Sequence, residues 1–300
     1  MAELVPLRAG ALAVDIAPHL GGSLTAFTRG SEHILRETPL TALSDKKPTL
    51  AGSYPMIPFS NRIADARFAF GGETFQLNRN FGDSPHAIHG NAWQRDWTVE
   101  AAEPSEARLS LDHDPAEGAR AREWPFAYRA EQSFVLEPDS LTITLSLENR
   151  DSRDMPAGFG LHPYFDKQGA SLKFAADTVW QSDDRLLPTE RTAVPEGWNC
   201  RDFRTMDEIA PVDHLFEGWG GVAEIVYPDR NLSIRIVAEP IFAKLVVFRL
   251  DERSFFAVEP VTHMVDAVNR MDGVANHGLQ VLAPGAAIRG TVRFEIGTLR

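Results

Sequence analysis

Strict alternation of apolar and polar residues is the feature that most restricts the fold of this chain. Every second residue is apolar in residues 141–147, and the same pattern recurs in residues 232–237, 291–296 and 108–112. A side-chain period of two places one row of residues in a core and the other toward solvent, as in a half-buried β-strand. These runs therefore predict sheets with one buried face.

Short turn signals lie between these runs, because each connecting stretch contains glycine, proline, aspartate or asparagine. They are residues 70–73, 137–140, 227–231 and 283–286. Such spacing predicts an all-β chain of antiparallel strands joined by short loops, as in a β-sandwich. Long helical patterns do not alternate with the strands, which argues against a doubly wound α/β fold. Residues 263–271 and 201–210 are the stretches where we expect one or two helical turns.

Length and charge set the broad class of the protein. The 300 residues suffice for one large core, and no repeat or flexible linker divides them, so we expect one domain spanning residues 1–300. Lys and Arg number 30 and Asp and Glu number 42, a formal net charge of 30 − 42 = −12. An acidic surface argues against binding to nucleic acid or to an anionic membrane, because phosphate contacts need a basic face.

Location and redox state follow from two further observations. Residues 1–22 lack the basic start and continuous apolar stretch of a secretory signal, and no window reaches the roughly 18 uninterrupted apolar residues of a membrane span. The single cysteine, Cys200, has no partner for an internal disulfide and cannot form a cysteine-based metal site. We therefore expect a soluble cytoplasmic protein, monomeric or homodimeric, that binds a small molecule.

His162 and Glu259 each stand directly before a proline, within residues 158–165 and 255–263. A proline forces the preceding residue into extended geometry and cannot donate to a β-ladder, so each side chain is expected where a strand stops pairing. Aromatic and apolar residues flank both. An imidazole and a carboxylate placed in this way can act as acid and base on a small substrate. A structural histidine and a half-exposed acid at a strand end fit the same pattern.

Asn61 and Arg62 belong to residues 53–63, an apolar stretch in which two prolines argue against a central strand. The planar donors of an arginine suit hydroxyl or carboxylate oxygens, so Arg62 is either a substrate clamp or a structural arginine tied to a core carboxylate. Asp213 precedes an apolar pair and is read either as a substrate-binding acid or as a loop cap.

Two histidines three residues apart, His86 and His89, suggest a metal site at first sight. A zinc site needs a further ligand at suitable spacing, and the chain offers no cysteine cluster or second histidine pair, so we expect no metal. Gly90 permits a tight turn and a close approach of backbone to ligand. Trp93 offers a flat apolar face of the kind that sugar sites use. We therefore favour His89 as a neutral hydrogen-bonding group in a pocket.

These short motifs resemble, in type and order, those of the aldose 1-epimerases, also called galactose mutarotases. A nucleophile elbow, a phosphate loop and a dinucleotide fingerprint are all absent from the sequence. The resemblance covers nearly the whole chain. It rests on Asn61-Arg62-Ile63, His89-Gly90, His162-Pro163-Tyr164-Phe165, Asp213-His214-Leu215-Phe216, Glu259-Pro260 and Leu282-Ala283-Pro284-Gly285.

The resemblance implies a galactose-mutarotase-like antiparallel β-sandwich, or supersandwich, with few short helices. It also implies cofactor-free interconversion of the α and β anomers of a free aldose. By position, Glu259 is similar to the general base for the C1 hydroxyl and His162 to the general acid for the ring oxygen. His89 is then a catalytic hydrogen-bonding group near that oxygen. The implied substrate-binding residues are Arg62, Asn61, Asp213 and Trp93.

The motifs depart from the family pattern in ways that leave the sugar open. Asn91 replaces the second glycine of His-Gly-Gly, and residues 57–60 replace the usual Gly-Arg-Tyr-Ala. One alternative is a sugar-phosphate (hexose-6-phosphate) 1-epimerase, which needs cations that converge on the phosphate. The candidates are Arg62, Arg67, Arg79 and Arg95. The other alternative is a non-catalytic carbohydrate-binding or regulatory module of the same fold.

Overall fold

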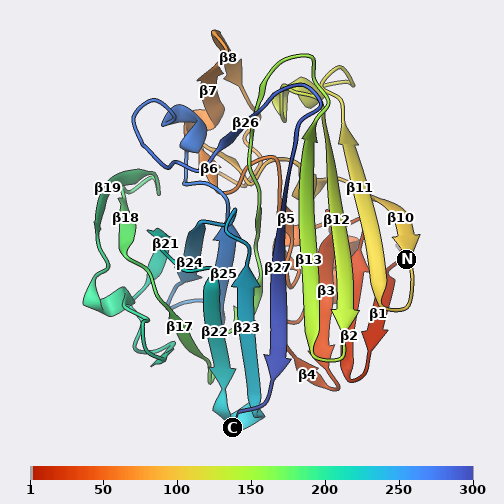
Figure 1. Ribbon diagram of the computed structural model, residues 1–300, viewed down its shortest axis with the longest axis vertical. Helices are drawn as coiled ribbons and strands as arrows, with labels where there is room; N and C mark the ends of the chain where they lie inside the picture. Colours follow the sequence, from red (N-terminus) through yellow and green to blue (C-terminus); the bar gives the residue numbers. More distant parts are fainter. Residues whose placement is uncertain (1–2, 300) are drawn as a thin grey trace.

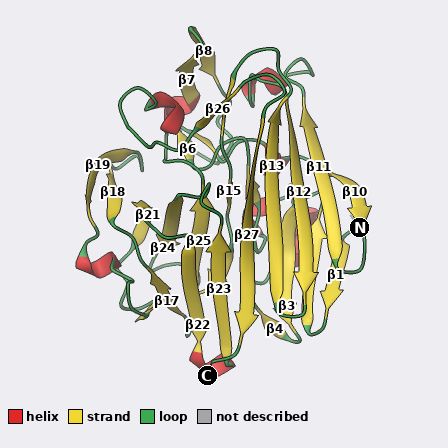
Figure 2. Cartoon of the chain, viewed as in Figure 1, coloured by secondary structure: helices red, strands yellow, loops and turns green. Residues whose placement is uncertain are grey.

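The computed structural model describes residues 3–299 and consists mainly of antiparallel strands (Figures 1 and 2). The predicted all-β class with few short helices is confirmed. Helical structure amounts to the five-residue α1 (Leu40–Ser44) and to short 3₁₀ turns. These turns are η1 (Pro48–Leu50), η2 (Ala64–Ala66), η3 (Ala92–Gln94), η4 (Arg120–Arg122), η5 (Glu196–Trp198), η6 (Pro228–Arg230) and η7 (Ala267–Asn269). No helix in residues 3–299 is long and apolar enough to cross a membrane.

A nine-stranded sheet forms the broad wall in which β11, β12, β13 and β27 lie side by side in Figure 1. In spatial order its strands are β10 (Thr98–Ala102), β11 (Glu106–His113), β12 (Tyr128–Glu137), β13 (Ser140–Asn149), β27 (Ala287–Gly297), β23 (Leu232–Ala238), β22 (Val222–Tyr227), β17 (Ser171–Phe174) and β20 (Arg204–Thr205). The four alternating runs of the sequence lie in β11, β13, β23 and β27, as predicted.

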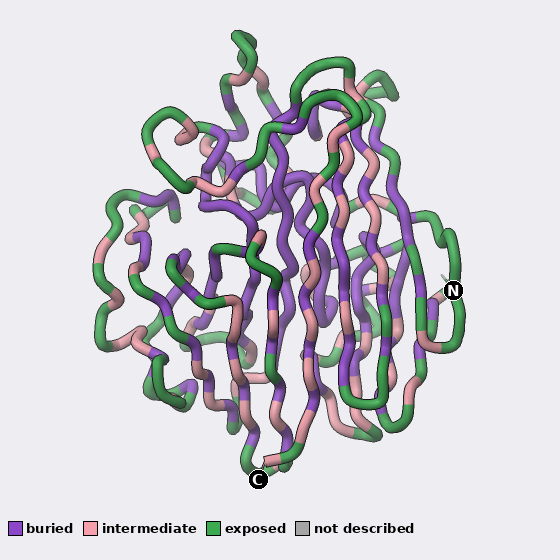
Figure 3. The backbone as a smooth tube through the Cα atoms, viewed as in Figure 1, coloured by how far each residue is buried: buried purple, intermediate pink, exposed green. Residues whose placement is uncertain are grey.

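The register of this sheet explains why those runs alternate. Phe294 of β27 lies opposite Leu141 of β13 on one side and opposite Ile236 of β23 on the other. All three side chains are buried, and Figure 3 shows buried positions alternating with more exposed ones along these strands. Burial of such a side chain contributes about 1.5–3 kcal/mol relative to exposure. One apolar row shared by three strands therefore fixes the pairing.

An eight-stranded sheet positions most of the polar residues that the sequence singled out. Its strands are, in order, β19 (Pro188–Ala193), β18 (Thr178–Ser182), β21 (Val212–Glu217), β24 (Lys244–Arg249), β25 (Phe255–Val261), β15 (Gly160–Leu161) and β5 (Pro55–Met56), with β16 (Tyr164–Asp166) also paired to β25. Asp213 lies in β21, Glu259 in β25, and His162 between β15 and β16. Residues far apart in sequence thus meet on neighbouring strands.

The remaining strands form smaller sheets around these two. A four-stranded sheet contains β1 (Val5–Ala9), β2 (Leu12–Ala17), β3 (Ser23–Arg29) and β4 (Glu32–His33). Three two-stranded sheets pair β6 (Arg62–Ile63) with β9 (Ala87–Ile88), β7 (Arg67–Phe70) with β8 (Glu73–Gln76), and β14 (Met155–Ala157) with β26 (Gln280–Leu282). Leu7, Ile143 and Phe256, from three different sheets, belong to one continuous cluster of buried apolar residues.

The two helical expectations had different outcomes. The stretch 263–271 contains a 3₁₀ turn, η7. The expectation of a helix in 201–210 was wrong, because Arg204 pairs with Leu172 of β17 instead. Glu208 accepts hydrogen bonds from the backbone N–H and the hydroxyl of Thr205, at 2.8 and 2.9 Å. This local contact resembles a helix start, but pairing with the neighbouring strand prevails.

Candidate active site

A cleft of about 420 Å³ gathers most of the polar residues singled out from the sequence. Glu259 reaches it from β25, Asp213 from β21 and Arg62 from β6, while His162 enters from the break between β15 and β16. Asn61 and His89 also line it. A volume of this size lies in the usual range for small-molecule sites, about 300–1,000 Å³.

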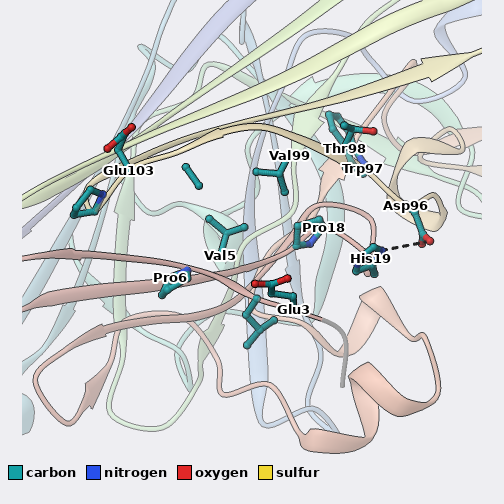
Figure 4. A pocket seen from close by; sticks show the side chains of 13 residues that line it. Glu3, Val5, Pro6, Pro18, His19, Asp96, Trp97, Thr98, Val99 and Glu103 are labelled. Carbon is teal, nitrogen blue, oxygen red and sulfur yellow. Dashed lines mark ion pairs between the residues drawn. The ribbon is translucent and has the colours of Figure 1, made fainter.

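A larger hollow of about 750 Å³ lies between β1 and β10 (Figure 4). It contains an imidazole and a carboxylate, those of His19 and Asp96, 3.5 Å apart. Their side chains are 50% and 58% exposed, so water screens the pair. The acid and the imidazole of the smaller cleft are buried, and that difference makes the smaller cleft the candidate active site.

The cleft brings His162 and Glu259 into contact. His162 Nε2 lies 3.3 Å from Glu259 Oε1, and the two side chains are 9% and 3% exposed. The backbone N–H of His162 donates to Tyr54 O at 3.0 Å, which anchors the residue at the break between its strands. His162 and Glu259 are 259 − 162 = 97 positions apart in the sequence. The sheet nevertheless places both side chains within reach of one small molecule.

The prediction that a strand stops pairing at Glu259 holds for one edge of β25 and is wrong for the other. Toward β24 the pairing continues through Pro260 to Val261. Toward the other neighbours it runs with β16 as far as Ala257 and resumes with β15 at Val261. Glu259 therefore has no ladder partner on that edge. Proline lacks an N–H donor, so an interrupted edge is where it fits into a strand.

Burial disfavours the charged form of both groups. It raises the pKa of Glu259 well above its ordinary value, with the charge of Asp213 adding and that of Arg62 opposing. Burial also lowers the pKa of His162 to about 3, with Arg36 and Arg62 contributing in the same direction. Because the two groups are in contact, the protonation of one affects that of the other.

Two buried atoms of this pair have no hydrogen-bond partner within residues 3–299. They are Glu259 Oε2 and His162 Nδ1. Buried polar atoms in folded proteins are usually paired, so each unpaired one asks for an explanation. Glu259 lines the cleft, but its Oε2 atom has almost no exposed surface, so a ligand would reach it only if neighbouring side chains moved.

Arg62 is held from two sides in the cleft. Its Nη2 lies 3.3 Å from Asp213 Oδ2, and its Nη1 donates to Asn61 Oδ1 at 3.0 Å. The side chains of Arg62 and Asp213 are 17% and 16% exposed, so the pair is accessible from the cleft. Because a guanidinium has five N–H donors in a fixed plane, such anchoring leaves further donors for oxygen atoms of a ligand.

His89 is fixed as a hydrogen-bond donor. Its Nδ1 accepts from the backbone N–H of Asn61 at 3.0 Å, so the neutral ring carries its proton on Nε2. Burial, together with the charges of His162 and Arg62, holds the pKa of His89 well below its ordinary value. The ring is therefore neutral at physiological pH. The role predicted for His89, hydrogen bonding to a molecule in the pocket, stays a prediction.

The close approach expected at Gly90 is to the chain itself rather than to a ligand. Gly90 has φ +69°, and a Cβ built on it would lie 1.9 Å from the carbonyl oxygen of Ile57. The backbone N–H groups of Asn91 and Ala92 donate to that same oxygen at 3.1 and 3.2 Å. Gly90 thus lets the His89 turn pack directly on the segment that leads to Arg62.

Trp93 does not line the cleft, contrary to the expectation that its face meets a sugar. It is buried behind Tyr54, with ring centroids 5.6 Å apart, and its indole N–H donates to Gly90 O at 3.0 Å. This bond turns the ring toward the protein. The aromatic side chains that do line the cleft are Tyr54, Phe81, Tyr164, Phe248 and Phe255. Of these, Tyr164 belongs to the aromatic residues that the sequence places beside His162.

The four arginines proposed for phosphate binding do not converge. Arg67, Arg79 and Arg95 are absent from the cleft lining, and Arg95 is paired with Glu123. Two other arginines, Arg36 and Arg253, line the cleft with Arg62. No local motif points to either of them, so sequence reasoning missed both.

Arg36 is tied to the walls of the cleft. Its Nη2 donates to the carbonyl oxygens of Thr49 and Ala51 at 2.8 and 2.7 Å. Its guanidinium lies 3.9 Å from the ring centroid of Tyr164 and 4.4 Å from that of Phe255, within the range of cation–π contacts. These partners lie far from Arg36 in the chain, which is why its own neighbours gave no signal.

Across residues 3–299, no three side chains of His, Cys, Asp or Glu cluster in a way that could hold a metal ion. His86, the neighbour of His89 in the apparent metal motif, lies outside the cleft lining. Its Nδ1 accepts from the backbone N–H of Asp65 at 3.0 Å.

Taken together, the cleft residues offer a buried acid–imidazole pair, an arginine clamp and a neutral N–H donor. This set suits proton transfer on a molecule rich in hydroxyl groups.

We expect the protein to lose stability as the pH falls from about 6.5 to about 4. Burial lowers the pKa of several imidazoles, to about 3 for His162 and about 4 for His263. The other histidines with pKa values lowered chiefly by burial include His86, His89 and His113. In the unfolded chain these imidazoles take up protons near their ordinary pKa, about 6.5, whereas in the folded chain they stay neutral to lower pH. The neutral rings therefore contribute fully to the stability of the fold above the ordinary pKa. This contribution is lost as the pH falls from that pKa through the pKa values of the folded state.

Thermal denaturation at a series of pH values checks this expectation. The raised pKa of Glu259 acts in the opposite sense, because its contribution is lost as the pH rises, and one carboxyl offsets only part of several imidazoles. We expect Tm to fall steadily below about pH 6.5. A Tm that stays level down to about pH 4.5 would contradict the neutral, buried state of these rings.

Comparisons with known proteins found a family model and relatives that resemble this chain. The family model described as aldose 1-epimerase matches residues 3–295. The chain is 29% identical over 309 residues to an uncharacterized Escherichia coli (strain K12) protein, YphB, with 97% of each chain covered. It is 26% identical over 212 residues to galactose mutarotase from Mus musculus, covering 65% of this chain and 58% of that protein.

A solved structure shares the fold over nearly its full length. The crystal structure of a candidate aldose 1-epimerase from Escherichia coli K12 matches with a TM-score of 0.88 and 26% sequence identity, covering 99% of both chains. The β-sandwich fold expected from the resemblance is thus confirmed.

Proposed function

The chain belongs to the aldose 1-epimerase family, and we propose that it interconverts the α and β anomers of a free aldose by acid–base opening and closure of the sugar ring. The observation that carries the proposal is the buried contact of 3.3 Å between His162 Nε2 and Glu259 Oε1. Anomer exchange removes one proton from the sugar and delivers one to it, with no redox step. A pair that shares one proton supplies both transfers.

In the proposed reaction Glu259 takes the proton of the C1 hydroxyl while His162 delivers one to the ring oxygen. The bond between C1 and the ring oxygen breaks and C1 becomes an aldehyde. Rotation about the C1–C2 bond presents the other face of the aldehyde. Closure then reverses both proton transfers, so the atoms and protons of the sugar balance over the cycle. On this proposal the C1 hydroxyl lies against the carboxyl group of Glu259, which lines the cleft.

The position of the shared proton bears on these roles. Burial favours the neutral arrangement, with Glu259 protonated and His162 neutral. Transfer of that proton from Glu259 to the imidazole gives an ionised pair. This is the form in which Glu259 can take the C1 hydroxyl proton and His162 can deliver one to the ring oxygen. Both arrangements have the same total charge, so pH does not select between them. Activity on this proposal depends on one proton being present on the pair, whichever partner holds it.

The other cleft residues would bind and orient the sugar. Arg62 and Asp213, held together at 3.3 Å, offer donors and acceptors to hydroxyl groups, and Asn61 orients the arginine. On this proposal the Nε2–H of His89, which lines the cleft, donates a hydrogen bond near the ring oxygen. Fixing the reactants in register adds the advantage of proximity to the acid–base chemistry.

Anomer exchange of freshly dissolved α-aldoses, followed by polarimetry or NMR, tests the proposal. We expect exchange with at least one aldose of a panel to be faster than with heat-denatured protein. Calorimetric binding of a sugar without faster exchange of any aldose would instead favour the non-catalytic sugar-binding module.

A sugar that carries phosphate away from C1 is the second candidate substrate, and Arg253 is the observation that favours it. Its side chain is exposed and lines the cleft. Within residues 3–299 no carboxylate lies within 4.0 Å of its side-chain nitrogens, whereas Arg62 is matched by Asp213. An unmatched guanidinium in the cleft of a chain with net charge −12 suits an anionic substituent.

We expect Arg253→Ala to separate the two candidates. If the phosphate is part of the substrate, the variant should raise KM for glucose 6-phosphate about 10- to 150-fold, because a charge-assisted hydrogen bond contributes about 1.5–3 kcal/mol. Its KM for glucose should stay the same. Arg289→Ala removes another exposed arginine, from β27 and outside the cleft, and serves as the matched control. Equal use of both sugars by the parent protein and by Arg253→Ala would remove the phosphate from consideration.

A further inference from the structure

One buried imidazole, that of His263, lies where the segments that carry the proposed acid, base and clamp meet. His263 follows Glu259 by four residues, just beyond β25. Its Nε2 accepts a hydrogen bond of 3.0 Å from the backbone N–H of Ser60, two residues before the clamp arginine. Its ring also covers Gly158, four residues before the proposed acid. A Cβ built on that glycine would lie 2.2 Å from Cδ2 of the ring.

The hydrogen bonds of the ring fix its tautomer. Nδ1 lies 2.8 Å from Met264 O and must donate to it, which leaves Nε2 as the acceptor for Ser60. Burial lowers the pKa of His263 to about 4; the bond to Met264 opposes this, and the charges of His277 and Lys244 add to it. The ring is therefore neutral at physiological pH, and its acceptor nitrogen remains free to bind the Ser60 N–H.

The clamp segment pairs with β9 only through the short strand β6, and several of its other backbone N–H groups donate to side chains. Asn61 adopts φ +57°, which turns the chain just before the short strand β6. The N–H of Asn61 donates to His89 Nδ1 at 3.0 Å, and that of Ala64 donates to Asp266 Oδ1 at 2.9 Å. The bond from Ser60 to His263 is one of the contacts that link this segment to the chain emerging from the strand of the proposed base. The backbone N–H of Asp266 provides another, because it donates to Arg62 O at 2.8 Å.

We propose that His263 is a positioning residue for the reaction, holding the clamp segment in register with the acid and the base. The inference rests on the proposed function. His263 is absent from the cleft lining, so it acts through Ser60 and not on the sugar. Ser60 is itself buried, so its N–H needs a protein partner if the imidazole acceptor is lost. The segment would then shift, and a displacement of about 1 Å at a clamp costs about 10²-fold in rate.

Two substitutions separate the effects of the two hydrogen bonds that the His263 ring makes. In His263→Asn the amide reaches the place of Nδ1 and keeps a donor for Met264, but nothing reaches Ser60. In His263→Gln the longer side chain can bring an oxygen to the place of Nε2 and accept from Ser60. We expect His263→Asn to lower kcat/KM by about 10- to 100-fold, with KM raised because the clamp moves. His263→Gln should recover most of that loss.

Kinetics at a temperature where both variants are folded decide the matter. A merely structural role would lower Tm in both and leave kcat and KM of the folded protein unchanged, which would overturn the proposal. Equal losses in the two variants would overturn it too, because the acceptor would then not be the feature that matters. An inactive parent protein with every aldose tested would instead count against the proposed function.

NMR of the unmodified protein keeps the inference testable if His263→Asn does not fold. With ¹⁵N-labelled histidine, the chemical shifts of the His263 ring identify which nitrogen carries the proton. We expect the proton on Nδ1 and slow hydrogen exchange at the Ser60 amide. A proton on Nε2 would overturn the proposal, since a protonated nitrogen cannot accept from Ser60.

Discussion

Replacement of Glu259 by glutamine is expected to lower kcat by about two to four orders of magnitude while the fold survives. The amide has nearly the shape of the carboxyl group and can keep its contact with His162 at 3.3 Å, but it cannot take up a proton. Burial raises the pKa of the native carboxyl, so its ionised form is costly in the folded state. Tm of Glu259→Gln should therefore equal or exceed that of the parent protein.

His162→Ala is expected to lower kcat over a similar range, and the double variant should be little worse than either single one. In the proposed mechanism the two side chains share one proton, so removal of one partner leaves the other without its function. Polarimetry on an aldose that the parent protein accepts gives the three rates. Full activity in either single variant would refute the assigned role, and strictly multiplicative losses would contradict the shared proton.

His214→Ala provides a matched control for the histidine substitution. His214 is the neighbour of Asp213 on β21, and its ring packs on Trp198 at a centroid distance of 4.5 Å. It is absent from the cleft lining, because successive residues of a strand point to opposite faces. We expect kcat of His214→Ala to match that of the parent protein. The comparison separates the effect of removing an imidazole from this sheet from the effect of removing the proposed acid, His162.

The fold was predictable where local pattern and tertiary contact agree. Leu141 and Phe294 were assigned to core faces from period-two alternation, and they meet across β13 and β27. Residues 201–210 were misread because Glu208 and Thr205 form the local contact of a helix start, while pairing of Arg204 with a distant strand decides the structure. Local signals thus sufficed for long strands and failed for a short one.

The cleft residues differ in the same way. His162, Glu259, Arg62 and Asp213 stand in recognisable short motifs, and the structure brings them together. Arg36 stands in no motif, because its partners are carbonyl groups and the ring of Tyr164, 164 − 36 = 128 residues away. Trp93 was predicted to contact a sugar because the sequence shows a large flat ring at this position but not the direction in which the ring points. The hydrogen bond to Gly90 O turns it inward.

Gly90→Ala is expected to be among the most destabilising single substitutions of this chain, with a loss above about 4 kcal/mol in the free energy of unfolding. A left-handed backbone alone costs a non-glycine residue about 1–2 kcal/mol. At Gly90 the added Cβ would also lie 1.9 Å from the carbonyl oxygen of Ile57. The turn that carries His89 and the segment that leads to Arg62 would have to separate, so activity should fall with stability.

Gly82→Ala isolates the backbone cost from the clash. Gly82 also has a positive φ, +50°, but no atom lies within 4 Å of a Cβ built there. Chemical denaturation should therefore show a loss of about 1–2 kcal/mol for Gly82→Ala and a much larger loss for Gly90→Ala. Equal losses would show that the contact between Gly90 and Ile57 is not tight. The constraint on residue 90 would then be conformational alone, and His89 would not depend on that packing for its position.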